Sequence, residues 1–409
     1  MKKIAIIGSG IAGLTCAYYL KDKFDITVFE AEEYIGGHTH TVTVAKGDEK
    51  ADIDTGFIVF NDRTYPNFIN LLNELQVDFQ PTEMSFSVRN DSIDLEYNGN
   101  SLSTLFAQRA NLLRPKFYKM LLDIVRFNKA VRSASNGSET IGEYLDSSNY
   151  SNLFKDNYLL PMISAIWSMG LDSCRDFPLH FFTRFFKNHG LLDIVNRPQW
   201  YTIIGGSSSY IAPLTRDFAN RIKCSTPVTG IERTSSGVKV KTAIDSETFD
   251  EVILACHGDQ AYALLSNPTN NEVLILKNFK CTNNSVVLHT DTSILPKRKA
   301  AWASWNYQMV DAGKEMTTLT YNMNILQCLN LQHTYLVSLN QPIRDEYVLG
   351  RYSYSHPVYS LEALSSQQKW QTISGTKNIH YCGAYWFNGF HEDGVRSGLR
   401  VVRMLEESV

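Results

Sequence analysis

The sequence predicts an α/β protein in which a Rossmann-like parallel sheet, assembled from separated segments, carries an inserted α+β domain. Three observations predict this class. A glycine-rich turn joins an N-terminal strand to a helix, a buried apolar run lies near residue 252, and a C-terminal strand ends in a glycine before a last helix. At 409 residues the chain is long enough for two or more domains.

The N-terminal stretch KIAIIGSGIAGLTCAYYL has the pattern of a dinucleotide site. Residues 3–7 form a short apolar run that is typical of a buried strand. Gly8, Gly10 and Gly13 follow with the spacing Gly-x-Gly-x-x-Gly. The first glycine permits a tight turn, the second lets the backbone approach a pyrophosphate, and the third lets helix pack on strand. The helix over 14–20 then directs its N-terminal N–H groups at the phosphates.

A second strand over 26–29 ends at Glu30, and a carboxylate at this place suits the diol of a ribose. Glycines alone would also fit a turn before an ordinary helix. Strand, glycine pattern, helix, strand and acid in this order favour the dinucleotide site.

The middle of the chain is mixed in pattern. Residues 85–100 alternate as in a hairpin with Asn98-Gly99 at its turn, and residues 104–132 and 139–200 are mainly helical. Beyond residue 200 come a hairpin (PVTGIERTSSGVKVKT), a buried strand (FDEVILAC), several strand-like runs, and the final strand and helix (NIHYCGAYW, GVRSGLRVVRMLEE). We therefore expect a discontinuous nucleotide-binding domain over 1–80, 201–265 and 375–409, and a substrate domain over 81–200 and 266–374.

Composition excludes several classes of function. The net charge of −3 and the pI near 6.4 give no signal for nucleic-acid binding. The seven cysteines are scattered and contain no C-x-x-C, which argues against a disulfide framework or a metal site and for a reducing compartment. No signal peptide and no run of 18 apolar residues is present. We expect a cytoplasmic protein.

Four motifs together resemble the flavin-containing amine oxidase superfamily, which includes phytoene-desaturase-like and protoporphyrinogen-oxidase-like enzymes. They are GSGIAG, EAEEYIGG, YCGA and DGVRSG, and they occur in the expected order. The stretches DIDTGFIVFN, SHPVYS and FNGFHEDGVRSG are most similar to bacterial oxidoreductases associated with the synthesis of cyclopropane, methyl-branched and furan fatty acids.

The resemblance implies an FAD-dependent oxidoreductase that desaturates a fatty acyl or other lipid chain by hydride transfer to the flavin N5. It also implies a methyltransferase as a partner. No cysteine has a flavin-linking context, so we expect noncovalent FAD. An amine oxidase that acts on a soluble amine is the first alternative, and a flavin-binding accessory protein without turnover is the second.

Carried over position by position, the resemblance assigns a set of residues to FAD. They are Gly8, Ser9, Gly10, Ala12, Gly13, Glu30, Gly36, Gly37, His38, Thr55, Gly56, Val228, Gly383, Asp393, Gly394 and Val395. One departure concerns charge, because many relatives have arginine where this chain has His38. A neutral histidine would not compensate the diphosphate.

Two further groups are predicted around the flavin. His356 is the expected base or substrate-positioning group, with Tyr354 on the same stretch and with His391 and Glu392 as alternatives that could also cap the last helix. The aromatic residues expected to form the wall of an apolar substrate tunnel are Tyr352, Tyr385, Trp386, Phe387 and Phe390.

The stretch over 105–132 carries seven cations against one acid, Asp123, with leucines and phenylalanines between them. Pro115 should divide it into two helices. A basic amphipathic stretch of this kind suits an anionic membrane surface, although it equally fits a solvated face above a packed one. The neighbouring run LHFFTRFFKNHGLL adds four phenylalanines and favours lipid contact.

Overall fold

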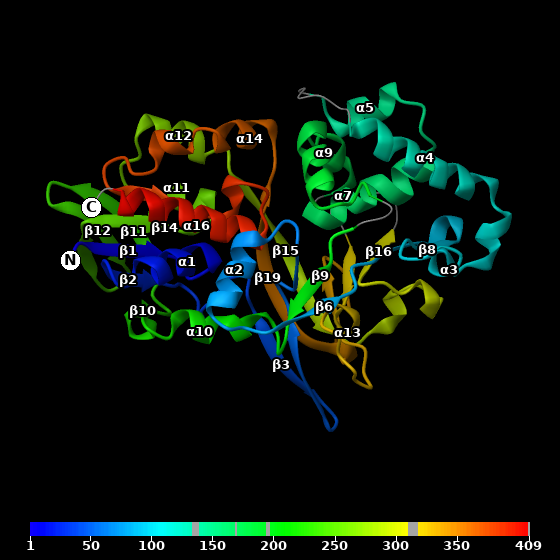
Figure 1. Ribbon diagram of the computed structural model, residues 1–409, viewed down its shortest axis with the longest axis horizontal. Coiled ribbons are helices and arrows are strands. Elements are labelled where there is room, and N and C mark those ends of the chain that lie inside the picture. Colours follow the sequence, from blue (N-terminus) through cyan, green and yellow to red (C-terminus); the bar gives the residue numbers. More distant parts are fainter. Residues whose placement is uncertain (133–138, 168–169, 194–196, 310–317, 408–409) are drawn as a thin grey trace.

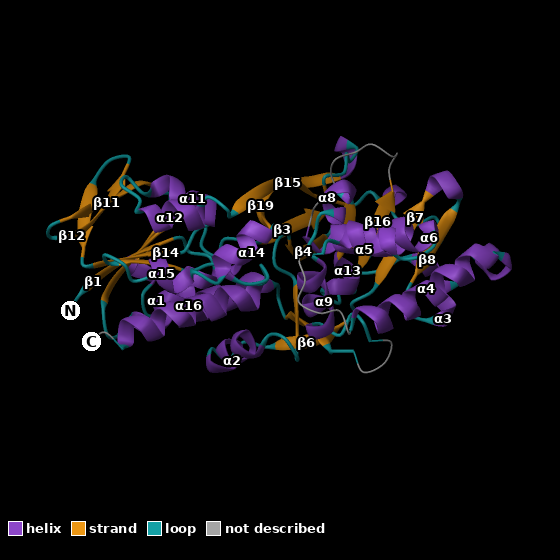
Figure 2. Cartoon of the chain, turned by 90° about the horizontal axis from the view of Figure 1, so that it is seen from above, coloured by secondary structure: helices purple, strands orange, loops and turns teal. Residues whose placement is uncertain are grey.

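The computed structural model describes residues 1–132, 139–167, 170–193, 197–309 and 318–407. The molecule is elongated, and both termini lie in one lobe (Figures 1 and 2). Helices α3 (Leu102–Leu105) and α4 (Pro115–Val131) lie at the opposite end. Two long antiparallel strands, β15 (Lys280–His289) and β19 (Val348–Val358), lie between these ends.

The first lobe is built on a five-stranded parallel sheet of order β10-β2-β1-β14-β20. Its strands are β1 (Lys3–Ile7), β2 (Asp25–Phe29), β10 (Ile222–Lys223), β14 (Glu251–Leu254) and β20 (Ile379–Tyr381). The predicted α/β class is confirmed, since strands from three separated stretches of the chain pair in one sheet. The near-continuous apolar character of these strands fits a sheet that is covered on both faces.

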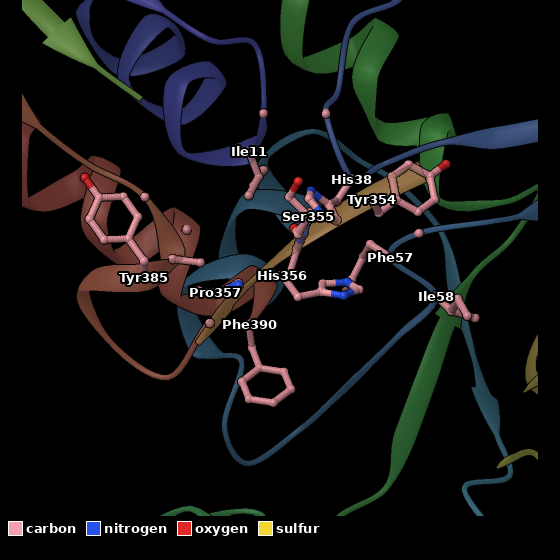
Figure 3. Close-up of a pocket in the computed structure, with 18 of the residues that line it drawn as sticks. Ile11, His38, Phe57, Ile58, Tyr354, Ser355, His356, Pro357, Tyr385 and Phe390 are labelled. Carbon is pink, nitrogen blue, oxygen red and sulfur yellow. Dashed lines mark hydrogen bonds between the residues drawn. The ribbon is translucent and has the colours of Figure 1, made fainter. Parts of the chain in front are cut away.

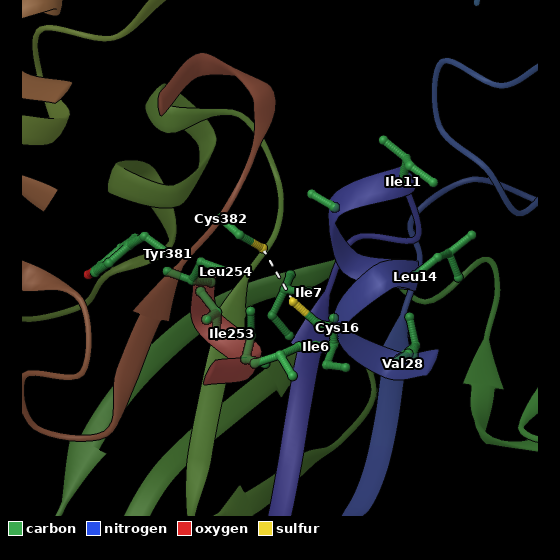
Figure 4. Packing of buried hydrophobic residues seen from close by; sticks show 14 of the residues in the cluster. Ile6, Ile7, Ile11, Leu14, Cys16, Val28, Ile253, Leu254, Tyr381 and Cys382 are labelled. Carbon is green, nitrogen blue, oxygen red and sulfur yellow. Dashed lines mark hydrogen bonds between the residues drawn. The ribbon is translucent and has the colours of Figure 1, made fainter. Parts of the chain in front are cut away.

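Helices α1 (Ile11–Leu20) and α16 (His391–Glu406) pack against each other beside this sheet. They come close because Gly398 has no side chain: a Cβ there would lie 2.7 Å from the carbonyl oxygen of Ala12. Figure 4 shows the buried contact beneath them, where the Cys16 and Cys382 sulfur atoms lie 3.9 Å apart. All seven cysteines are free thiols.

Smaller elements complete the first lobe. They are α2 (Pro66–Glu74), α10 (Ile211–Thr215), α11 (Gly258–Leu264), α12 (Asn270–Leu276), α14 (Leu361–Gln367), α15 (Trp370–Ile373) and the sheet β11 (Val228–Thr234), β12 (Gly237–Thr242), β13 (Ser246–Phe249). Leu276, Phe279 and Trp370 pack in the core of this lobe. The domain boundaries predicted from the sequence assigned these three residues to the substrate domain. The structure shows instead that α12, α14 and α15 belong to the nucleotide-binding lobe.

The second lobe is built on a seven-stranded sheet of order β19-β15-β18-β17-β16-β7-β8. Its further strands are β18 (Leu336–Leu339), β17 (Leu319–Asn322), β16 (Trp305–Met309), β7 (Phe86–Asn90) and β8 (Leu95–Asn98). Its helices are α5 (Ile141–Ser147), α6 (Asn152–Phe154), α7 (Leu160–Trp167), α8 (Leu171–Arg175), α9 (Leu179–Asn188) and α13 (Met323–Leu326). Two small sheets join the lobes: β3 (Thr41–Lys46) with β4 (Glu49–Asp54), and β5 (Val59–Asn61) with β9 (Trp200–Ile203) and β6 (Phe79–Thr82).

Two predictions for this lobe are wrong in detail. The hairpin of β7 and β8 turns at Asp91–Ile93 and not at Asn98-Gly99, because the Asn90 side chain accepts from the Ser92 N–H and closes a turn there. The phenylalanines of α9 do not face the outer surface of the molecule. Phe181, Phe182, Phe185 and Phe186 are all at least 97% buried in the aromatic core between α4, α7 and α9.

Candidate functional site

A large cavity of about 1020 Å³ extends from the first lobe into the second. Gly8, Ala255 and Gly383 line it, and each lies one or two residues beyond the carboxyl end of a parallel strand. This edge of a parallel sheet is where nucleotides bind in open α/β folds. Figure 3 shows the middle of the cavity, where β19 passes His38 and the loop at Phe57.

The nucleotide end of the cavity is shaped for a pyrophosphate. A Cβ added at Gly10 would meet no atom within 4 Å, so the space above this glycine is open, and Gly10 lines the cavity at the N-terminus of α1. A Cβ at Gly13 would lie 2.0 Å from the Gly8 carbonyl oxygen, which shows the close packing of helix on strand. The two glycines therefore have the different roles that their spacing predicts.

Glu30 lies at the end of β2 and is held by backbone and hydroxyl donors. Its Oε2 accepts from the Ser9 N–H at 2.8 Å and from the Ser9 hydroxyl at 2.6 Å, and its Oε1 accepts from the Glu32 N–H at 2.9 Å. Carboxylate oxygens have further lone pairs, so Glu30 can still accept from a ribose diol. Ser9 does not line the cavity but positions this carboxylate.

His38 provides no positive charge for a diphosphate. Its Nε2 donates to the Ser355 carbonyl oxygen at 3.1 Å. Burial, together with the nearby His356 and His257, lowers the pKa of His38 to about 3, so the ring is neutral at physiological pH. Among the described residues that line the cavity, Arg197 is the only lysine or arginine, and a diphosphate must therefore be held mainly by N–H groups and the dipole of α1.

Most residues assigned to the cofactor line the cavity. These are Gly8, Gly10, Ala12, Glu30, Gly36, Gly37, His38, Gly56, Val228, Gly383 and Gly394. Others support it from behind. Thr55 bonds to the Tyr354 hydroxyl at 2.7 Å, Asp393 accepts from the N–H groups of Asn388 and Phe390, and Val395 is buried in the core. Burial raises the pKa of Asp393 to about 7.

The other end of the cavity lies within the second lobe and is mainly apolar. The residues lining it include Met84, Phe86, Tyr97, Tyr158, Met162, Ile166, Trp167, Phe185, Leu191, Trp200 and Trp305. Glu30 and Glu32 are the only carboxylates among the described lining residues, and both belong to the nucleotide end. This compartment is therefore suited to a hydrocarbon chain.

Three of the five predicted tunnel aromatics line the cavity, namely Tyr352, Tyr385 and Phe390. Trp386 is only 1% exposed and packs on Phe279 in the core, with ring centroids 4.8 Å apart. Phe387 lies under the guanidinium group of Arg396, 4.1 Å from its ring centre. These two residues therefore support the wall from behind and do not form it.

His356 is held by a chain of amides that fixes its tautomer. The Ser285 N–H donates to Asn340 Oδ1 at 3.0 Å, so the amide nitrogen of Asn340 donates to Asn284 Oδ1 at 2.8 Å. Asn284 Nδ2 then donates to His356 Nδ1 at 2.8 Å. Burial, with the nearby His257, lowers the pKa of His356 to about 4. The neutral ring therefore carries its proton on Nε2, which argues against the predicted role as a base and for a hydrogen-bond donor.

This amide chain can be tested by an isosteric charge change. In Asn284→Asp a carboxylate replaces the donor beside Nδ1, so Nδ1 becomes protonated and the pKa of His356 should rise from about 4 toward neutrality. Imidazole ¹⁵N chemical shifts followed against pH measure both the tautomer and the pKa. The wild-type ring should show the Nε2–H tautomer and no titration above pH ~5.

Asn283→Asp is the matched control, because Asn283 lies one residue away on β15, is exposed, and accepts from the Ser355 hydroxyl. Its substitution should leave the His356 tautomer unchanged. Equal titration of His356 in both variants would contradict the amide chain.

The other predicted catalytic residues are also engaged. Tyr354 bonds to Thr55 and, at 2.8 Å, to His40 Nδ1, and burial raises its pKa well above the usual range. His391 stacks on Phe57 with ring centroids 3.7 Å apart, and burial lowers its pKa to about 3.

Glu392 does not line the cavity. Its carboxylate accepts from the Asn67 side chain at 2.5 Å and from the N–H of Phe68 at 2.9 Å, which ties α16 to α2. Glu392 therefore has a structural role at the start of α2, and not at the start of the last helix as the alternative expected, where the Asp393 side chain accepts instead.

Several site residues were not predicted. Asn284 and Asn340 act through pairing between strands far apart in sequence, and no local pattern marks them. Phe57 directly follows Gly56, which was predicted as a cofactor residue, so the sequence could have indicated Phe57 as a neighbour of the cofactor. Arg197 lies at the apolar end of the cavity, three residues before Trp200 in the sequence. A basic residue close to an aromatic one was the sequence pattern that could have indicated Arg197.

The family model "Flavin containing amine oxidoreductase" matches residues 11–328. A 1-hydroxycarotenoid 3,4-desaturase from Flavobacterium sp. is 28% identical over 233 residues, which cover 52% of this chain and 41% of that enzyme. The match thus spans less than half of the relative's length.

Solved structures share the whole fold. Cyclohexylamine oxidase from Brevibacterium oxydans superposes with a TM-score of 0.70 at 14% identity, over 100% of this chain and 99% of that chain. A CLA-producing fatty acid isomerase from P. acnes gives a TM-score of 0.67 at 13% identity, over 98% of both chains. At these identities the likeness shows the fold alone.

Proposed function

Because the chain belongs to the flavin-containing amine oxidoreductase family, and is therefore an FAD-dependent oxidoreductase, we propose that it desaturates a fatty acyl or other lipid chain. Desaturation removes two hydrogens from neighbouring carbons. FAD, when bound, supplies the acceptor for the hydride at N5, while the second hydrogen leaves as a proton. The protein must hold the chain beside the flavin and exclude water.

The residues present fit FAD. The open space above Gly10 takes the pyrophosphate at the N-terminus of α1, and Glu30 at the end of β2 takes the ribose. Gly383 and Gly394 line the cavity where α16 begins. The partial positive charge at this helix end would stabilise negative charge on a reduced ring system. His356, with its proton on Nε2, can donate a hydrogen bond into the same cavity.

The observation that carries the proposal is the chemistry of the apolar end. Most amines are cationic at neutral pH, and a carboxylate in the substrate compartment would stabilise that charge. Among the described residues that line the cavity in the second lobe, none is a carboxylate, and the charged side chain is that of Arg197. This distribution favours an apolar chain with an anionic or neutral head over an ammonium ion.

The similar proteins support the proposal without deciding it. One relative found by sequence is named a 1-hydroxycarotenoid 3,4-desaturase. The same fold occurs in an amine oxidase and in a fatty acid isomerase, so the fold itself does not select the substrate. The methyltransferase partner stays a prediction.

Product analysis tests the proposed reaction. FAD-loaded protein incubated with phospholipids that carry fatty acyl chains, saturated or methyl-branched, should yield acyl chains with one additional double bond, detected by mass spectrometry. Protein stripped of FAD is the control and should yield none. Formation of an aldehyde from an amine, with the acyl chains unchanged, would favour the amine oxidase alternative.

A further inference from the structure

Exposed apolar side chains gather at one end of the molecule. Leu113 is 87% exposed and Leu122 is 70% exposed. We define the apolar patch as Leu102, Leu112, Leu113, Tyr118, Leu122 and Val125, which are half of the large apolar side chains that are exposed among the described residues. All lie between residues 102 and 125, on α3, α4 and the turn between them. A concentration of this kind marks an interaction surface.

Helix α4 has two different apolar faces. Phe117, Met120 and Phe127 point into the core of the second lobe. Tyr118, Leu122 and Val125 follow the spacing i, i+4, i+7 and form a second stripe on the solvent side. The Tyr118 hydroxyl donates to the Leu112 carbonyl oxygen at 3.1 Å, which joins the stripe to the turn before the helix. A stripe in solvent contributes nothing to the core, so folding does not explain it.

Exposed cations lie on the same stretch of chain as the apolar patch. Arg109, Lys116, Lys119 and Lys129 are exposed, and none of them forms an ion pair within the described part of the chain. Arg114 differs, because it pairs with Asp94 at 3.2 Å. The one acid of the stretch, Asp123, faces inward, accepts from the Ser151 N–H and pairs with Arg126. The charge available to a partner on this surface is therefore positive.

The apolar patch adjoins the rim of the cavity. Gly99 and Asn100 are exposed and line the cavity, and α3 begins two residues later at Leu102. Ser101 and Thr104 fix this junction by capping α3 reciprocally. A chain that left a surface in contact with the apolar patch would therefore enter the cavity at its apolar end.

We infer that the apolar patch and its four free cations dock the protein on the surface of an anionic lipid bilayer, from which the cavity takes its substrate. The leucines insert among the acyl chains while the lysines contact lipid phosphates. None of the helices in the described part of the chain has the length and apolar character needed to span a bilayer. Only the origin of the substrate rests on the proposed function; the docking itself does not.

Vesicle binding of the FAD-loaded protein tests the inference without turnover. Wild-type protein should sediment with vesicles of phosphatidylglycerol and phosphatidylcholine at low salt and much less at ~0.5 M salt, where charges are screened. Lys116→Glu, Lys119→Glu and Lys129→Glu combined should weaken binding about 10²-fold, since each cation near a surface is worth about fivefold. Leu113→Asp with Leu122→Asp should weaken it at least about 10²-fold.

The matched control places the same change on the other lobe. Leu274 and Ile244 are 69% and 93% exposed and lie far from the apolar patch in sequence and in the fold, so Leu274→Asp with Ile244→Asp should bind as wild type does. Retained flavin absorbance confirms that each variant is folded. Absence of wild-type binding at low salt, or equal loss in the control, would overturn the inference. A patch variant that only turned a dimer into a monomer would assign this surface to a second copy instead.

Discussion

Replacement of Gly10 by leucine should give a folded, colourless protein. The side chain would grow into open space, since a Cβ at Gly10 meets nothing within 4 Å and the residue has an ordinary extended conformation (φ −66°, ψ 171°). That space is where a pyrophosphate must lie against the N-terminus of α1. We therefore expect flavin content near zero in purified Gly10→Leu, measured from the flavin absorbance and from FAD released on denaturation.

Gly99→Leu provides the control, because Gly99 lines the same cavity at the opposite end and its Cβ direction is almost open. This variant should stay yellow. Loss of FAD should also lower thermal stability, by about 2.7 kcal/mol where free FAD is a hundredfold above its dissociation constant. The Gly10→Leu protein should therefore unfold like wild-type protein stripped of FAD. A yellow Gly10→Leu protein would contradict the placement of the cofactor.

Replacement of Met162 by tryptophan should remove activity toward a long chain while FAD stays bound. Met162 lies on α7, is partly exposed to the cavity and belongs to its apolar end. A larger ring there would displace the chain, and a displacement of ~1 Å from the reacting position costs about 10² in rate. The rate of flavin reduction by an acyl lipid should fall by at least this factor.

Met162→Leu conserves volume at the same position and should reduce activity only slightly. Equal activity of the tryptophan variant, with its flavin unchanged, would show that the substrate does not occupy this compartment.

The nucleotide half of the site could be predicted because its signals are local. Gly8, Gly10 and Gly13 must stand at fixed spacing for the turn, the phosphate and the helix contact, and Glu30 must end the next strand. The structure places each of them accordingly. In the sheet, β2 and β14 pair with β1 on its two sides, and β10 and β20 add the outer strands.

The substrate half could not be predicted to the same depth, because its signals are tertiary. An aromatic run such as that of α9 looks alike whether it packs inside or faces lipid, and only the position of α4 and α7 decides that Phe181 and Phe185 are buried. The tautomer of His356 depends on Asn284 and Asn340 through strand pairing. Composition predicted lipid contact near α4, and this stays a prediction; the exposed stripe at Leu122 could be located only in the folded structure.

Anaerobic mixing of the yellow, FAD-loaded protein with acyl phospholipid vesicles, and separately with a panel of primary and secondary amines, tests the central claim most directly. Reduction of the flavin is followed by loss of its visible absorbance, and no oxygen or partner is needed for this step. The account predicts reduction by the acyl lipid and none by the amines. Fast reduction by an amine with none by any acyl lipid would contradict it, and no reduction by either would indicate a flavin-binding protein without turnover.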